Sequence, residues 1–251
     1  MKLLRAAFSQ RVMKVAVVPL LLTGLLVGCS GVHQDIRETF RYVFTSGEDF
    51  ELTPEQIADF PYTGIYVRRG NGPQNFVVLG FIEQLSAQGQ TVSQLHWVTS
   101  DEITLVTEHG RLVRTVGLAR AEQQPVLGSI DLHATSNRSA DPLRCLVTAP
   151  QGCPTAWERE VDYTTSSQSK SSRVSSQFET VANVMVELPT RMVETTHIIE
   201  RGRFHATGER FVNEFWAEPD GHVVKSKQTF MPGEAPLAIT QVKWIGREEQ
   251  E

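Results

Sequence analysis

The sequence lacks the short motifs on which most catalytic and metal sites are built. It has 3 cysteines in 251 residues, and no two of them form the C-x-x-C pair of redox or zinc sites. It contains no phosphate-binding loop and no G-x-S-x-G nucleophile turn. His197 and Glu200 are three residues apart, which places them on opposite faces of a strand. We therefore predict no catalytic residue, no metal and no cofactor.

No apolar run is long enough to cross a bilayer, which takes roughly 20 residues. The longest run, residues 15–27, follows several basic residues and precedes Gly28 and Cys29, so residues 1–28 are predicted to be a secretory signal peptide. Residues 13–29 alone also make a compact lipoprotein signal, so Met13 is an alternative start to Met1.

The end of this signal fits the pattern of bacterial lipoproteins. Residues 26–29 read LVGC, in which Cys29 is expected to be acylated, with palmitate among its lipids, after cleavage before it. Ser30 follows where an aspartate would retain the protein at the inner membrane, so we predict the periplasmic face of the outer membrane. The alternative is an ordinary signal peptide with an incidental cysteine.

Positive charge is also scarce. The chain has 24 basic and 29 acidic residues, and removing the four basic residues of the signal leaves 20 against 29, a net charge of −9. No basic stripe remains to bind phosphates, which argues against nucleic acid. With Cys29 assigned to lipid, Cys145 and Cys153 form an even pair in an oxidising compartment, and we predict a disulfide between them.

Alternation of apolar and polar residues is what the sequence has in abundance. From Tyr62 to Leu118 and again from Trp157 to Trp244, apolar residues recur at every second position between short turns. This predicts an all-β fold, in which antiparallel meander sheets form one barrel-like or sandwich domain over residues 61–251. Helices are predicted only in the anchor segment 29–60, at 32–44 and after the capping residue Thr53.

Two stretches are less regular. The region between Leu118 and Trp157 reads as irregular, and the serine-rich residues 164–176 read either as a linker or as a polar edge strand or mobile hairpin. We prefer the strand because a linker would split the core that later strands need.

Residues 95–118, LHWVTSDEITLVTEHGRLVRTVGL, gather histidines and acids without placing them together. With His109 and Gly110 as a two-residue turn, Glu108 faces Arg111 and Val106 faces Val113. The charges then pair at a solvent-exposed tip. His96, Asp101, Glu108 and His109 are accordingly predicted to be dispensable for metal binding or hydrolysis.

Several aromatic side chains are able to stack on sugar rings or contact a partner, although such residues more often fill a core. The candidates are Tyr62, Tyr66, Trp97, Trp157 and Trp216.

Larger blocks of the sequence are distinctive in combination. FPYTGIYVRRGNGPQNFVVLGFIEQ, the 95–118 stretch, DPL at 141–143 and NEFWAEPDGHVVKSKQTFMPGEAPLAITQVKW resemble the GfcB/YjbF family of outer-membrane, group 4 capsule polysaccharide lipoproteins. The resemblance implies an all-β fold and a role in assembling or exporting extracellular polysaccharide. The implied partners are a periplasmic protein and a large outer-membrane β-barrel of the same system, and no catalytic residue comes with it. The Cys145–Cys153 loop and the serine-rich stretch depart from the common pattern.

Three functions remain open from the sequence. The first is a non-enzymatic accessory for assembly or secretion of extracellular or capsular polysaccharide. The second is a lipid or glycolipid carrier, which requires a continuous, open apolar cavity. The third is a polysaccharide-modifying hydrolase, which requires two converging carboxylates.

Overall fold

The fold was analysed in a computed structural model that describes residues 48–246 apart from 88–89, 100–102, 119–129, 148–151 and 166–167. Cys29, Ser30, the signal peptide and the helix predicted at 32–44 lie outside the described residues, as does Asp101.

Alternating burial along the strands is the local pattern from which the fold is built. In β7 (Ala156–Thr165) and β10 (Arg210–Ala217), every second side chain is buried while its neighbours are mostly exposed or half-buried. A sheet of such strands has one apolar face, which it buries by curving around it.

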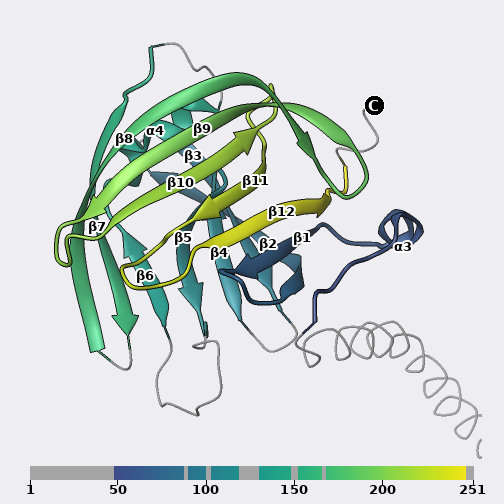
Figure 1. Cartoon of the computed structure of the whole chain (residues 1–251), viewed down its shortest axis with the longest axis horizontal. Helices are drawn as coiled ribbons and strands as arrows, with labels where there is room; N and C mark the ends of the chain where they lie inside the picture. The colour runs from purple at the N-terminus through teal and green to yellow at the C-terminus, as the bar shows by residue number, and fades with distance from the viewer. Residues whose placement is uncertain are drawn as a thin grey trace, which may run out of the picture. The chain divides into compact units, whose positions relative to one another are not determined.

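The described strands form one antiparallel sheet, confirming the predicted all-β class. Its 12 strands are ordered β5-β4-β3-β2-β1-β12-β11-β10-β9-β8-β7-β6, so almost every strand pairs with its neighbour in sequence. Figure 1 shows β8 to β10 arching in front of β3 to β5, so that the sheet curls into a barrel. The remaining strands are β1 (Gly64–Arg69), β2 (Gln74–Ala87), β3 (Gln90–Val98), β4 (Thr104–Glu108), β5 (Arg111–Val116), β6 (Asp131–Thr135), β8 (Gln168–Glu187), β9 (Met192–Phe204), β11 (Val223–Gln228) and β12 (Leu237–Lys243).

A side chain closes the seam between the two edge strands, β5 and β6. Asp131 accepts hydrogen bonds from the Thr115 hydroxyl at 3.0 Å and from the backbone N–H groups of Gly117 and Leu118 at 3.1 Å each. The Leu132 N–H donates to the Thr115 oxygen at 2.9 Å. Asp131 is 5% exposed, so this buried carboxylate substitutes for part of the missing backbone ladder.

The interior of the barrel is packed with apolar side chains from nearly all strands. One cluster includes Trp97, Leu105, Val161, Phe204 and Ile239, and a second surrounds Leu143 and Phe215. Interior positions filled in this way leave room for ligands only where polar or small side chains interrupt the packing.

The helices agree with the sequence in one place and differ in another. The helix α3 (Pro54–Asp59) begins at Thr53 with the predicted capping box. The prediction of helices only near the N-terminus is wrong, because η2 (Arg138–Ala140) and α4 (Pro142–Leu146) occupy the stretch predicted as irregular. The Asp141 side chain caps α4. No helix among the described residues is long and apolar enough to span a membrane.

The serine-rich stretch belongs to the β7–β8 hairpin rather than to a linker. β8 pairs with β7 on one side and with β9 on the other, so the strand interpretation holds but the edge-strand version of it is wrong. The compact unit Ser46–Glu251 includes both the segment 48–60 and the sheet. Residues 48–60 attach to it through contacts such as the hydrogen bond from the Leu52 N–H to the Tyr66 hydroxyl at 2.7 Å.

The seam predicts a specific weakness. Asp131→Ala should lower the free energy of unfolding by roughly 2 to 4 kcal/mol, because it leaves buried donors without an acceptor. Asp162→Ala, which removes an exposed carboxylate from the adjacent strand β7, should change it by no more than about 0.5 kcal/mol. Urea denaturation followed by circular dichroism measures both, and equal effects would show that the seam does not depend on Asp131.

Candidate functional site

The tip of the β4–β5 hairpin is packed inside the barrel. His109 and Gly110 both have positive φ, 48° and 81°, as a two-residue hairpin turn requires. A Cβ on Gly110 would lie 2.5 Å from Cβ of Val223, so only glycine allows this close approach. The Gln228 side chain fixes the tip, donating to the Gly110 carbonyl at 2.8 Å and accepting from the Leu112 N–H at 2.9 Å.

The predicted register of this hairpin is correct only near its turn. In the strand register, Glu108 lies opposite Arg111 as predicted. A bulge then shifts the ladder so that Val106 faces Arg114 rather than Val113. The prediction that the hairpin tip is exposed to solvent is also wrong, because Glu108 and Arg111 are 6% and 4% exposed. Packing of the tip against Val223 and Gln228 buries charges that a free hairpin would leave in water.

These buried charges have partners from distant parts of the chain. Arg111 binds the Asp141 carboxylate through two nitrogens and donates to Glu200 at 2.7 Å. Glu200 also pairs with Arg159 at 2.8 Å and accepts from the Asn213 amide at 3.1 Å. Glu108 instead lies 3.2 Å from a guanidinium nitrogen of Arg138 and also accepts from Gln94. The predicted Glu108–Arg111 pair is therefore replaced by longer-range pairs.

Electrostatics keep Glu200 ionised. Burial alone would raise the pKa of its carboxyl group, but the charges of Arg111 and Arg159, with a hydrogen bond from Ser176, lower it to about 2. The Arg111 guanidinium is also 4.8 Å from the Trp157 ring and 5.1 Å from the Phe215 ring. A carboxylate ionised at neutral pH and held by four donors does not supply a proton, so we assign this network to structure rather than acid catalysis.

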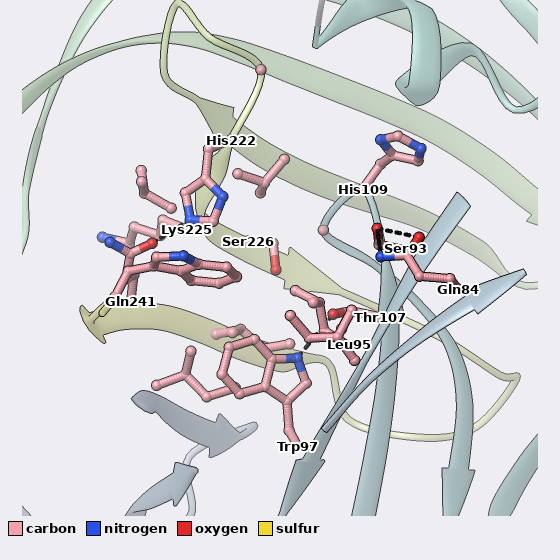
Figure 2. A pocket seen from close by; sticks show the side chains of 18 of the residues that line it. Gln84, Ser93, Leu95, Trp97, Thr107, His109, His222, Lys225, Ser226 and Gln241 are labelled. Atoms are coloured by element: carbon pink, nitrogen blue, oxygen red, sulfur yellow. Dashed lines mark hydrogen bonds between the residues drawn. The ribbon is translucent and has the colours of Figure 1, made fainter. Parts of the chain in front are cut away.

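On the other side of the hairpin tip, polar side chains interrupt the core and leave a cavity of about 370 Å³. Figure 2 shows the cavity with Trp97 and Thr107 at its floor, Gln84 and Ser93 on one side, and His222 and Gln241 on the other. Trp244 and the β4–β5 turn also line it. We call this cavity the Trp97–Trp244 cleft, and its volume is within the usual range of small-molecule sites.

The side chains of the cleft are held by contacts among themselves. The Trp97 indole N–H donates to the Thr107 hydroxyl at 2.9 Å. The Trp97 and Trp244 ring centroids are 6.2 Å apart at an interplanar angle of 68°, and His222 lies 4.5 Å from Trp244 at 73°. The His222 ring also hydrogen-bonds the Gln241 side chain. The cleft therefore has fixed aromatic surfaces beside fixed amide and imidazole groups.

The described lining of the cleft carries little charge, with one lysine, Lys225, and no arginine. Burial lowers the pKa of His109, and the nearby positive charge of Arg144 lowers it further, so this ring is neutral at pH 7. The described residues of the lining include no aspartate or glutamate. Among the described residues, no three histidine, cysteine or acidic side chains are grouped closely enough to hold a metal ion.

The structure separates the five aromatic residues singled out in the sequence. Trp97 lines the cleft, whereas Trp157 is buried under the two arginines of the charged network. Trp216 stacks on His197 at 4.5 Å, on the opposite face of the sheet from Glu200. Tyr66 is 6% exposed, and Tyr62 is 37% exposed beside Phe60.

Most of the cleft was not predicted from the sequence. Trp244, His222 and Gln241 come from the C-terminal strands, while Gln84 and Ser93 come from the β2–β3 hairpin. Pairing of β1 with β12 brings these segments together, and no local motif signals that pairing. The structure also contains the Cys145–Cys153 disulfide, and Cys145, in α4, borders a second pocket together with Thr91 and His109, which also line the cleft.

These features define a class of protein, a packed antiparallel β-barrel with one cleft lined by aromatic, aliphatic and uncharged polar side chains beside Lys225. The family model described as "Group 4 capsule polysaccharide lipoprotein gfcB, YjbF" matches residues 37–242. The chain therefore belongs to the group 4 capsule polysaccharide lipoprotein family.

Individual relatives agree with this assignment. The chain is 29% identical to the uncharacterized lipoprotein YjbF of Escherichia coli K12 over 224 residues, covering 87% of this chain and 93% of that protein. It is 28% identical to the uncharacterized lipoprotein GfcB of the same strain over 219 residues, with the same coverage. The crystal structure of the hypothetical lipoprotein YmcC from Escherichia coli K12 superposes with a TM-score of 0.67 at 26% identity, covering 86% of this chain and 96% of that one.

The charged network predicts acid sensitivity with a defined origin. Because folding lowers the pKa of Glu200 from 4.5 to about 2, its contribution to stability is complete above pH 4.5 and is lost as the pH falls toward 2. Glu200→Gln should cost roughly 3 to 5 kcal/mol at neutral pH, because it leaves buried arginines uncompensated. The difference between wild type and variant should shrink as the pH falls from about 4.5 to about 2.

Glu179→Gln is the matched control, because Glu179 forms an exposed pair with Arg201 at 2.9 Å on the adjoining strands β8 and β9. It should change the free energy of unfolding by less than about 1 kcal/mol at any pH. Urea denaturation at several pH values provides the test, and a Glu200→Gln effect that does not vary with pH would contradict the assignment.

Proposed function

We propose that this protein is a non-enzymatic accessory of extracellular or capsular polysaccharide assembly or secretion, anchored by lipid to the periplasmic face of the outer membrane. The observation that carries the proposal is membership of the capsule polysaccharide lipoprotein family across residues 37–242. The lipobox ending at Cys29, followed by Ser30, supports the anchor and its location.

The distribution of polar groups supports a binding role over a hydrolytic one. A hydrolase of glycosidic bonds generally uses two carboxylates that flank the bond. The described lining of the Trp97–Trp244 cleft has none, and Glu200 and Asp141 are buried and occupied by arginines. The cleft thus offers surfaces for contact without a pair of groups for acid and base catalysis.

The same packing disfavours a lipid carrier. That function needs a continuous apolar cavity, but apolar clusters and the charged network fill the barrel interior. Amide and hydroxyl groups border the Trp97–Trp244 cleft beside aliphatic side chains such as Ile65, Leu95 and Ile239, and these polar groups are costly to desolvate against an acyl chain without new hydrogen bonds.

The proposed partners are a periplasmic protein and an outer-membrane β-barrel of the same export system. Two or three acyl chains on Cys29 would hold the protein at the membrane almost irreversibly, because each buried methylene adds about 0.8 kcal/mol of membrane affinity. The anchor therefore raises the effective concentration of the barrel domain beside a pore in that membrane.

Removal of the anchor tests this proposal. Cys29→Ala, secreted as a soluble protein, should keep the circular dichroism spectrum and melting temperature of the β domain. It should nevertheless restore extracellular polysaccharide poorly in a deletion strain at native expression, because its concentration at the outer membrane falls.

The wild-type gene and Ser30→Asp are the matched controls. Wild type should restore secretion and fractionate with the outer membrane, whereas Ser30→Asp should remain acylated but shift to the inner membrane and restore less. Normal secretion by the deletion strain would overturn the proposal, and full secretion by the soluble Cys29→Ala protein would show that anchoring is incidental.

A further inference from the structure

The Trp97–Trp244 cleft combines properties that point to a particular ligand chemistry. We propose that it is a binding site for a short, uncharged segment of polysaccharide, an inference that rests on the proposed function and names its ligand. The cleft accommodates one end or one short stretch of a chain, because its volume is about 370 Å³.

Aromatic rings supply the first part of the argument. Sugar rings have flat C–H faces that pack on aromatic surfaces, and tryptophan offers the largest such surface at little cost in side-chain entropy. Trp97 and Trp244 meet edge to face, so two ring surfaces of different direction border one cavity. The Trp97–Thr107 hydrogen bond and the His222 contact to Trp244 hold both rings in place before a ligand arrives.

Uncharged polar groups supply the second part. Gln84 and Ser93 lie on one side of the cleft, and Gln241 lies opposite (Figure 2). Amide and hydroxyl groups both donate and accept hydrogen bonds, as sugar hydroxyls do. Gln84 and Ser93 are exposed and hydrogen-bonded to each other at about 3 Å, so they can exchange this bond for bonds to a ligand without leaving a buried group unpaired.

The charges around the cleft favour a neutral ligand. No carboxylate of the described lining repels or binds a cation, and the pKa of His109 is lowered by burial and by Arg144. Lys225 lines the cleft as well (Figure 2), but its ammonium group lies 5.6 Å from the ring of Trp216, on the outer face of the sheet. An acidic sugar or a phosphate would therefore lose its hydration without gaining a buried cation in return.

Access to the cleft agrees with a polymeric ligand. Gln84, Thr91 and Ser93 are exposed along the arm formed by β2 and β3, while Trp97 at the floor is 4% exposed. A chain end can thus pass from an open polar rim to a closed aromatic floor. The remainder of the polymer stays outside, where a neighbouring protein can hold it.

Direct binding tests the inference with the full-length acylated protein in lipid nanodiscs. The probes are neutral gluco-, galacto- and manno-oligosaccharides and short oligosaccharides cut from the host's own extracellular polysaccharide. Ligand-observed NMR should detect saturable binding of at least one neutral probe. Trp244→Ala should weaken this binding about tenfold, the loss of one good aromatic contact. Ser93→Trp should abolish it by filling the rim.

Trp216→Ala is the matched control, since it removes a partly buried tryptophan from the outer face and should change the affinity by less than about twofold. Palmitate and an oligogalacturonate serve as apolar and acidic probes. The inference would be overturned if either of these probes bound more strongly than the neutral ones and Trp244→Ala reduced that binding. It would also be overturned if Trp244→Ala, Ser93→Trp and Trp216→Ala all retained binding of a neutral probe.

The failure of this inference is distinguishable from failure of the proposed function. If no neutral probe binds but the deletion strain loses secretion and wild type restores it, the accessory function stands and the glycan site is wrong. If Trp244-dependent binding is found but deletion leaves secretion unchanged, the site stands and the assigned process is wrong.

Discussion

The buried contact of Arg111 with Glu200 and Asp141 is the interaction on which the arrangement of the barrel depends. It joins the β4–β5 hairpin to β9 and to Asp141, the N-cap residue of α4. These elements are far apart in the sequence. Burying these charges is costly, and the cost is offset only because each carboxylate oxygen of Glu200 has two polar or charged partners. Such a network has one good geometry, so it places the hairpin tip more specifically than apolar packing alone. We infer that its main contribution is to position the tip rather than to raise net stability.

The position of that tip determines which part of the interior is filled and which stays open. One face of the hairpin carries Arg111 toward β9, and the other carries Thr107 toward Trp97. The tip therefore separates the buried charged network from the Trp97–Trp244 cleft. Gly110 and Gln228 make this possible, because glycine admits Val223 at close range and the amide pairs the backbone groups of the turn.

The sequence predicts the repeating parts of this fold better than its special contacts. Period-two alternation locates most strands, and the Thr53 cap is readable from its own neighbours, because both depend on residues close in sequence. The short strand β6 escapes detection because it has only 5 residues and a bulge between Leu132 and Ala134 interrupts the alternation of its burial. Glu108 and Arg111 look like an exposed tip pair because alternation cannot reveal that a hairpin folds against distant strands. Of the cleft, Trp97 was the one residue named as a possible ligand contact, and His109 was named only as dispensable, since the two sides of the cleft meet through the pairing of β1 with β12.

The relation between the cleft and the charged network bears on how binding could be communicated. The cleft and the network share the β4–β5 hairpin, whose backbone at Gly110 and Leu112 is bonded to one buried side chain, Gln228. A ligand that displaced Thr107 or His109 would therefore also disturb the two Gln228 hydrogen bonds and the buried ion pair of Arg111. Rigid surroundings of this kind favour a preformed site over one that closes around its ligand, because the cost of ordering has already been met in folding. A preformed cleft suits reversible contact with the proposed polysaccharide ligand, because tight capture would slow the proposed export.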